Sequence, residues 1–240
     1  MKNNKNEYEI DIKIIFLGEA GCGKTSMIKA YTDNEFNPNE IATNTPYIKN
    51  KIYTKNKKSF NICLWDNFGG KNYRPLTSNF YIGKDIVVFV YSITNRSSFE
   101  EIKNYWVNSV IDKIGNNAIF GLVGAKTDLY IYKEVPTNFG IEYAKEIGAS
   151  FKEVSAKKNR EEIKLFINDL IDKVLIKKNL IKKDEKKLSK KKKIAKEEKE
   201  LTDKLSLNKN NLTLLKEKKL LKKKENADNN FSILLKYLNY

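Results

Sequence analysis

This 240-residue sequence predicts an α/β fold: a mostly parallel six-stranded sheet with helices on both faces. Short apolar or alternating runs, bounded by turn residues, alternate along the chain with longer stretches of helical periodicity. The order is strand, helix, a two-strand hairpin and then repeated strand–helix pairs, which calls for parallel strands joined by crossover helices. All eleven Gly and all four Pro lie before residue 149, so turn-making residues stop well before a lysine-rich tail.

The elements follow in a regular order. The predicted strands are short and apolar or alternating, and they cover residues 10–17, 47–53, 60–65, 86–91, 118–123 and 150–154. Helices are predicted at residues 24–31, 97–114, 138–147 and 161–176. The last helix carries one apolar stripe, formed by Ile163, Phe166, Ile167, Leu170, Ile171 and Val174. Ligands of such sheets bind beyond the carboxyl ends of the strands, so chemistry is expected in the loops after Leu17, Trp65, Tyr91, Gly124 and Val154.

Composition excludes several classes of function. The chain has no histidine, which removes the usual acid–base residue of hydrolase triads and the commonest zinc ligand. Its two cysteines, Cys22 and Cys63, form neither a disulfide framework nor a zinc site. The longest apolar run, residues 86–91, is far shorter than the roughly 18 residues of a membrane-spanning helix. Because residues 1–11 also lack the apolar centre of a signal peptide, we expect a cytoplasmic protein.

Most of the net charge lies in the tail. The chain carries 46 Lys+Arg against 30 Asp+Glu, a net charge of +16, and residues 177–240 contribute +12 of it. These residues are predicted to be either a long solvated helix or a disordered polybasic segment. Basic clusters at 190–193 and 222–224, followed by an apolar stripe, suit an anionic membrane surface. The stripe consists of Phe231, Leu234, Leu235 and Leu238.

Other uses of the tail stay open. It could supply a partner helix, serve as a nuclear address or remain a solvated extension without a specific partner. Nucleic acid is disfavoured as a ligand, because the tail has no Arg and no stacking aromatic before Phe231.

One loop carries a specific motif. After the first predicted strand the chain reads Gly18-Glu19-Ala20-Gly21-Cys22-Gly23-Lys24-Thr25, which fits G-x-x-x-x-G-K-[ST] between a strand and a helix. The glycines let backbone N–H groups cradle phosphate oxygens, and the helix start adds partial positive charge. Lys24 is expected to reach the β- and γ-phosphates, and Thr25 to offer a hydroxyl to Mg²⁺. The alternative is a glycine-rich turn that only connects strand to helix.

Further motifs follow at characteristic intervals. They are Thr43; Leu64-Trp65-Asp66-Asn67-Phe68-Gly69; Arg74, Tyr81 and Gly83; Val90-Tyr91-Ser92-Ile93-Thr94 with Ser98-Phe99; Val123-Gly124-Ala125-Lys126-Thr127-Asp128-Leu129; and Ser155-Ala156-Lys157. With them, residues 8–176 resemble a Ras-superfamily small GTPase of the Rab branch, which has a P-loop NTPase G domain. Residues 177–240 are then a polybasic C-terminal extension. The resemblance implies binding of GTP/GDP together with Mg²⁺.

The resemblance also implies roles for single residues. Thr25, Thr43 and Asp66 would hold the magnesium ion, Asp66 through a bound water. Lys126 would pack along the guanine ring, and Asp128 would accept from the guanine N1 and N2 hydrogens. The implied nucleotide-binding residues are Gly18, Ala20, Gly21, Cys22, Gly23, Lys24, Thr25, Ser26, Thr43, Gly69, Lys126, Asp128, Ser155, Ala156 and Lys157. Taken alone, Thr43, Asp66 and Asp128 could equally be a loop threonine, a strand-end cap and a turn former.

The match breaks at four places. Gly70 stands where the family has the glutamine that orients the attacking water, so we assign no catalytic residue and expect slow hydrolysis. Ala125 replaces the guanine-contacting asparagine, which predicts weaker affinity with guanine selectivity retained through Asp128. Residues 44–48, in which Pro46 fixes φ, replace a stretch that is characteristic of the Rab branch. No cysteine follows Cys63, so we expect no prenylation.

The sequence therefore predicts an atypical Rab-like small GTPase, a magnesium-dependent GTP/GDP switch in vesicle traffic with slow intrinsic hydrolysis. The alternative is a pseudo-GTPase scaffold that acts through its surface or its tail, and a P-loop ATPase is a third interpretation. The expected partners are a guanine nucleotide, effector and regulatory proteins and, through the tail, an anionic membrane on which the protein would be peripheral. We expect a monomer.

Overall fold

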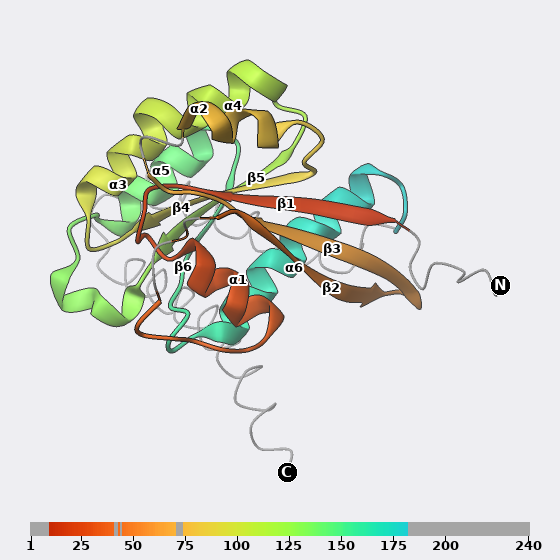
Figure 1. Ribbon diagram of the computed structural model, residues 1–240, viewed down its shortest axis with the longest axis horizontal. Helices are drawn as coiled ribbons and strands as arrows, with labels where there is room; N and C mark the ends of the chain where they lie inside the picture. Colours follow the sequence, from red (N-terminus) through yellow and green to blue (C-terminus); the bar gives the residue numbers. More distant parts are fainter. Residues whose placement is uncertain (1–9, 41–42, 44, 71–73, 182–240) are drawn as a thin grey trace, which may run out of the picture. The chain divides into compact units, whose positions relative to one another are not determined.

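The structure is a computed structural model that describes residues 10–40, 43, 45–70 and 74–181 (Figure 1). Six strands form one sheet in the order β2-β3-β1-β4-β5-β6. They are β1 (Asp11–Leu17), β2 (Tyr47–Lys55), β3 (Lys58–Asp66), β4 (Ile86–Ser92), β5 (Ile119–Ala125) and β6 (Ser150–Glu153). Among the described strands, β2 and β3 are the one antiparallel pair, and the other pairs are parallel. The mostly parallel sheet predicted from the order of elements is confirmed.

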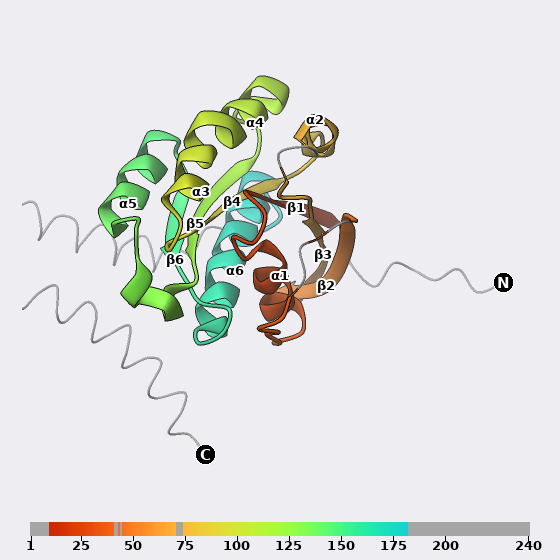
Figure 2. The same ribbon diagram turned by 60° about the vertical axis from the view of Figure 1, so that its left-hand side comes forward.

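Helices cover both faces of this sheet (Figure 2). They are α1 (Lys24–Thr32), α2 (Arg74–Thr77), α3 (Arg96–Glu101), α4 (Val107–Ile114), α5 (Thr137–Glu146) and α6 (Arg160–Lys177). α1 and α6 lie on one face, and α3, α4 and α5 lie on the other. Strand β1 contributes side chains to the hydrophobic cores on both faces of the sheet, because successive side chains of a strand point to opposite faces. Ile14 and Phe16 pack in the core with α1 and α6, whereas Ile15 and Leu17 pack in the core with α3 and α4.

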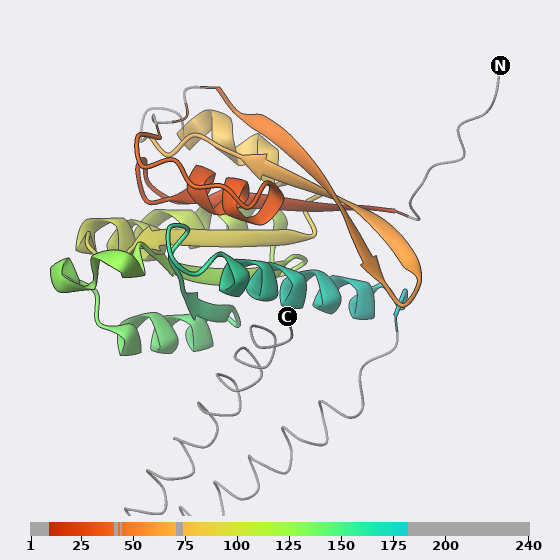
Figure 3. The same cartoon turned by 90° about the horizontal axis from the view of Figure 1, so that it is seen from below.

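Helix α6 matches its predicted amphipathic pattern. All six residues of the predicted stripe, from Ile163 to Val174, are buried against the sheet. Figure 3 shows α6 running along the sheet, with the far end of the β2–β3 hairpin reaching it. The hairpin turns at Asn56 and Lys57, whose φ values of 51° and 63° are typical of the tight turn that suits the twist of two strands. Near this turn Tyr53 Oη donates to Asp172 Oδ1 on α6 at 2.8 Å, which fastens the hairpin to the helix.

Some predicted boundaries differ from the structure. The single helix predicted at 97–114 is three segments, because a π-helical stretch, η3 (Ile102–Trp106), separates α3 from α4. Periodicity does not reveal this change, since the π-helical stretch is only five residues long and lies within a longer run of helical pattern. Three short elements were not predicted: α2, η2 (Ser78–Tyr81) and η4 (Thr127–Tyr132). Segments of four to six residues are too short to show a helical period.

The tail lies outside the described residues from position 182 onwards. The predictions for the clusters 190–193 and 222–224 and for the apolar stripe at 231–238 therefore stay predictions. Within the described part of the chain, no helix has the length and apolar character that crossing a membrane requires.

Candidate functional site

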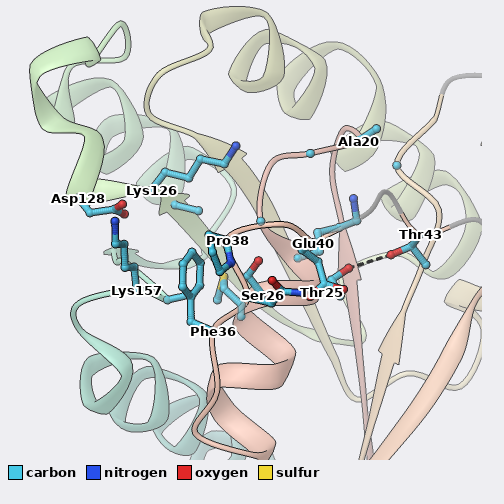
Figure 4. Close-up of a pocket in the computed structure, with 18 of the residues that line it drawn as sticks. Ala20, Thr25, Ser26, Phe36, Pro38, Glu40, Thr43, Lys126, Asp128 and Lys157 are labelled. Atoms are coloured by element: carbon cyan, nitrogen blue, oxygen red, sulfur yellow. Dashed lines mark hydrogen bonds between the residues drawn. The ribbon is translucent and has the colours of Figure 1, made fainter.

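A cavity of about 630 Å³ opens at the carboxyl ends of β1 and β5 (Figure 4). Twelve of the residues predicted to bind nucleotide line it: Ala20, Gly21, Gly23, Lys24, Thr25, Ser26, Thr43, Gly69, Lys126, Asp128, Ala156 and Lys157. In Figure 4, Thr25 and Thr43 lie at one end of the cavity and Lys126, Asp128 and Lys157 lie at the other. The structure thus brings together segments that are more than one hundred residues apart in the sequence.

Four predicted residues lie behind this lining. The carbonyl oxygen of Gly18 accepts a hydrogen bond from Lys24 Nζ at 2.9 Å. The Cys22 thiol is packed in the core, where burial raises its pKa, so this side chain is a small apolar filler of the loop and not a nucleophile. Ser155 is buried behind Asp128, and Asp66 is buried behind the two threonines.

The loop at the start of α1 presents a positive end to the cavity. Gly23 precedes the helix with φ of 107°, a conformation that L side chains rarely adopt, and its carbonyl accepts the first helical bond from Met27 N at 3.0 Å. Lys24 is only 5% exposed, and its ammonium donates to the carbonyl oxygens of Gly18 and Glu19, at 2.9 Å each. A buried ammonium bonded to neutral carbonyls at a helix N-terminus is suited to an anionic ligand such as a phosphate group.

Three oxygen-bearing side chains meet beside this loop and form the Thr25–Thr43–Asp66 cluster. Thr25 Oγ1 donates to Asp66 Oδ2 at 2.6 Å and lies 2.8 Å from Thr43 Oγ1. Thr43 Oγ1 donates to the same carboxylate oxygen at 3.2 Å. The second oxygen, Asp66 Oδ1, is buried and makes no well-formed hydrogen bond within the described part of the chain. Burial raises the pKa of this carboxyl against the lowering effects of Thr25 and Lys24.

This cluster fits a magnesium ion. Hydroxyl and carboxylate oxygens are the hard donors that Mg²⁺ prefers, and a buried carboxylate oxygen without a partner leaves a lone pair that a cation or its bound water would satisfy. When bound, the ion would neutralise phosphate charge in the cavity.

The other end of the cavity is organised around Asp128. Ser155 Oγ donates to Asp128 Oδ1 at 2.7 Å, and the same hydroxyl accepts from the backbone N–H groups of Lys157 and Lys158 at 3.2 and 3.1 Å. Lys126 has φ of 68°, a left-handed turn that ends β5 and begins η4. One serine therefore fixes both the carboxylate and the backbone of the facing loop, and the fixed carboxylate can accept hydrogen bonds from a ring that carries adjacent N–H groups.

Two glycines follow the Thr25–Thr43–Asp66 cluster along the chain. A Cβ atom at Gly69 would lie 2.4 Å from the backbone nitrogen of Ala20, so this position tolerates no side chain while the two loops stay in contact. Gly70 lines the cavity and, like Gly69, offers only backbone groups to it.

Several lining residues were not predicted. They include Phe36, Asn37, Pro38 and Glu40 from the loop after α1. Phe36 brings an aromatic ring to the cavity beside Lys157 (Figure 4), where it could stack on a planar ligand. Its one sequence signal is that it is a lone aromatic in a polar stretch. Glu40 is held by Lys29 of α1, whose Nζ lies 2.8 Å from both carboxylate oxygens.

Hydrogen bonds also connect Glu19, in the glycine-rich loop before α1, with α2 and α3. Arg74 donates to Glu19 Oε1 at 2.6 Å and to Glu101 Oε2 at 2.7 Å. Trp106 Nε1 donates to the same Glu19 oxygen at 3.0 Å, and the Arg74 guanidinium lies over the Tyr105 ring, 4.2 Å from its centroid. Helix α2, which begins at Arg74, is therefore anchored to the first loop of the site.

Comparison with known proteins agrees with this geometry. Residues 13–176 match the model of the Ras family. The chain is similar to the Ras-related protein RabC of Dictyostelium discoideum, with 35% identity over 67% of this chain and 82% of that protein. It is also similar to the Ras-related protein RABC1 of Arabidopsis thaliana, with 29% identity over 70% and 79% of the two chains. Its identity to the human Ras-related protein Rab-21 is 32%, over 65% of this chain and 69% of that protein.

Proposed function

The chain belongs to the Ras family as a Rab-like small GTPase, and from this we propose that it is a magnesium-dependent GTP/GDP switch with slow intrinsic hydrolysis, acting in vesicle traffic. The observation that carries the proposal is the pairing of the buried Lys24 ammonium with the Thr25–Thr43–Asp66 cluster in one cavity. The Lys24 ammonium supplies the positive charge that phosphate groups need, and the Thr25–Thr43–Asp66 cluster supplies the oxygen ligands that a divalent cation needs.

One end of the cavity would bind the phosphates of the nucleotide, and the other end would bind its guanine base. The N–H groups at the start of α1 and the Lys24 ammonium would bind the phosphates. Asp128, held by Ser155, would accept the guanine ring hydrogens, and Lys126 and Phe36 would pack against the faces of the base. Adenine presents an acceptor at N1 where guanine presents a donor, so the same carboxylate would disfavour ATP.

Thr43 would let the bound nucleotide control the conformation of the loop that contains it. It belongs to the loop between α1 and β2, and its hydroxyl bonds only to Thr25 and Asp66 among the contacts of the described residues. A nucleotide that keeps Thr43 at the cluster would order this loop, and one that does not would release it. Effector and regulatory proteins would recognise the difference.

Slow hydrolysis follows from Gly70. Phosphoryl transfer in such sites depends on a side chain that orients the attacking water, and Gly70 has none. The same observation favours the alternative of a pseudo-GTPase scaffold, in which the bound nucleotide stabilises the fold and output comes from protein contacts.

The test uses the full chain. We expect GDP or GTP, and not ATP, to co-purify with it, and fluorescent GDP to bind tightly only when Mg²⁺ is present. Single-turnover hydrolysis should be measurable but slow. Binding without hydrolysis would select the pseudo-GTPase scaffold, and displacement of GDP by equimolar ATP would refute guanine selectivity.

For the tail we propose contact with an anionic membrane, supported by its net charge of +12. The full chain should sediment with anionic vesicles at low salt and lose this binding at high salt. Deletion of residues 182–240 should abolish it. Equal recovery with neutral and anionic vesicles would instead point to a protein partner for the tail.

A further inference from the structure

Tyr47 is the first residue of β2, and it lies directly opposite Asp66, the last residue of β3. In an antiparallel pair, residues directly opposite each other point their side chains to the same face, with Cβ atoms about 5 Å apart. The tyrosine ring therefore lies on the side of the sheet where the Asp66 carboxylate meets Thr25 and Thr43.

Tyr47 Oη and Asp66 Oδ1 are both buried in this corner, and neither makes a hydrogen bond of good geometry to any of the described residues. The tyrosine hydroxyl is nevertheless close enough to the Asp66 carboxyl group to interact with it. A tyrosine hydroxyl can donate one hydrogen bond, and the Asp66 carboxylate on the same face of the sheet is an acceptor for it.

The other tyrosine of β2 behaves differently. Tyr53 points to α6, and its hydroxyl donates to Asp172 Oδ1 at 2.8 Å, so its hydrogen-bonding capacity is used within the domain. Buried polar groups normally have a hydrogen-bond partner, so the Tyr47 hydroxyl, which makes no bond of good geometry to a described residue, is a feature that needs an explanation.

We propose that Tyr47 is a positioning residue of the magnesium site, whose hydroxyl holds the Asp66 carboxylate in place for the ion. The inference rests on the proposed function. Carboxylates near a metal are themselves hydrogen-bonded, and such partners set the orientation of the carboxylate and hence the affinity for the metal. Tyr47 belongs to the stretch 44–48, which stands in place of a stretch characteristic of the Rab branch.

The experiment compares the full-length wild-type protein with Tyr47→Phe, which removes only the hydroxyl. The release rate of fluorescent GDP is measured while free Mg²⁺ is lowered with a chelator, and the midpoint concentration of Mg²⁺ is recorded. We expect this midpoint to rise about five- to tenfold in Tyr47→Phe. Release at saturating Mg²⁺ and the melting temperature of the GDP-loaded protein should stay close to wild type.

Tyr53→Phe is the matched control. It removes a hydroxyl from the same strand but away from the cluster, so its Mg²⁺ midpoint should not move. A midpoint for Tyr47→Phe within twofold of wild type, or equal shifts in both variants, would overturn the proposal. A wild-type protein that binds GDP without regard to Mg²⁺ would overturn the proposed function as well, and the two failures are therefore distinguishable.

Discussion

The Thr25–Thr43–Asp66 cluster and the Gly69–Gly70 segment are neighbours in one cavity, yet they are built in opposite ways. In the cluster, three side chains from α1, a loop and β3 bond to one another at 2.6 to 3.2 Å, and Asp66 is 1% exposed. In the glycine segment, a side chain is excluded at Gly69 by the backbone of Ala20 and is absent at Gly70.

Under the proposed function, this difference would separate binding from hydrolysis. Phosphates and a magnesium ion are held by charge, hydroxyl groups and backbone N–H groups, all of which the first region offers. Hydrolysis additionally needs a group that orients a water molecule, and the second region offers only its backbone. A chain of this kind can bind its ligand fully while turning it over slowly, and each region can be changed without the other.

The largest effect is expected when the binding region loses its charge. Lys24→Ala removes the buried ammonium that faces the phosphates, and charge-assisted hydrogen bonds to phosphate oxygens are among the strongest available. We expect affinity for GDP, measured by fluorescence titration, to fall about a hundredfold or more. Lys113→Ala on the exposed end of α4 is the control and should bind as wild type does. Undiminished binding by the Lys24 variant would remove the phosphate-loop assignment.

The second expected effect concerns the glycine segment alone. Gly70→Gln restores a side chain that can orient water, so single-turnover GTP hydrolysis should speed up about tenfold if the neighbouring groups are already arranged. GDP affinity should stay within a fewfold of wild type. Because any residue in place of glycine also stiffens the chain, Gly70→Ala is the control and should leave the rate low.

An unchanged rate in Gly70→Gln, with intact nucleotide binding, would contradict the separation of binding from hydrolysis. In that case Asn67 and Phe68, which lie between Asp66 and Gly69, would be the residues that misplace this loop. The pseudo-GTPase scaffold would then be the better supported function.

The sequence predicted the fold well because its signals are local. Apolar runs and turn residues located all six strands to within about two residues at either end, and the stripe on α6 matches its buried face. The glycine loop was recognised because G-x-x-x-x-G-K-[ST] combines backbone and side-chain requirements in eight consecutive positions.

Other parts of the site could not be read from the sequence alone. Phe36 and Glu40 lie in a polar loop without periodicity, and only the fold brings them to the cavity. The role proposed for Tyr47 depends on its register against Asp66, because a shift of one residue would turn it to the other face of the sheet. The bond from Arg74 to Glu19 joins residues that are 55 positions apart, and no local pattern announces it.

The smallest effect is expected at the end of the cavity around Asp128, where the guanine base would bind. It tests whether this end contributes less to nucleotide affinity than the end around Lys24, where the phosphates would bind. Ser155→Ala removes the hydroxyl that donates to Asp128 and accepts from the backbone of Lys157 and Lys158. Asp128 would lose its fixed orientation, and a net contribution of about 1 kcal/mol for such a hydrogen bond predicts a roughly fivefold loss of affinity. The loss should be equal for GDP and GTP and independent of Mg²⁺, because this end of the cavity does not contact the phosphates.

Ser59→Ala, in the exposed β2–β3 hairpin, is the matched control. A loss as large as that of Lys24→Ala would show that base recognition, and not the phosphate end, dominates binding, and a loss for GTP alone would link Ser155 to the Thr25–Thr43–Asp66 cluster.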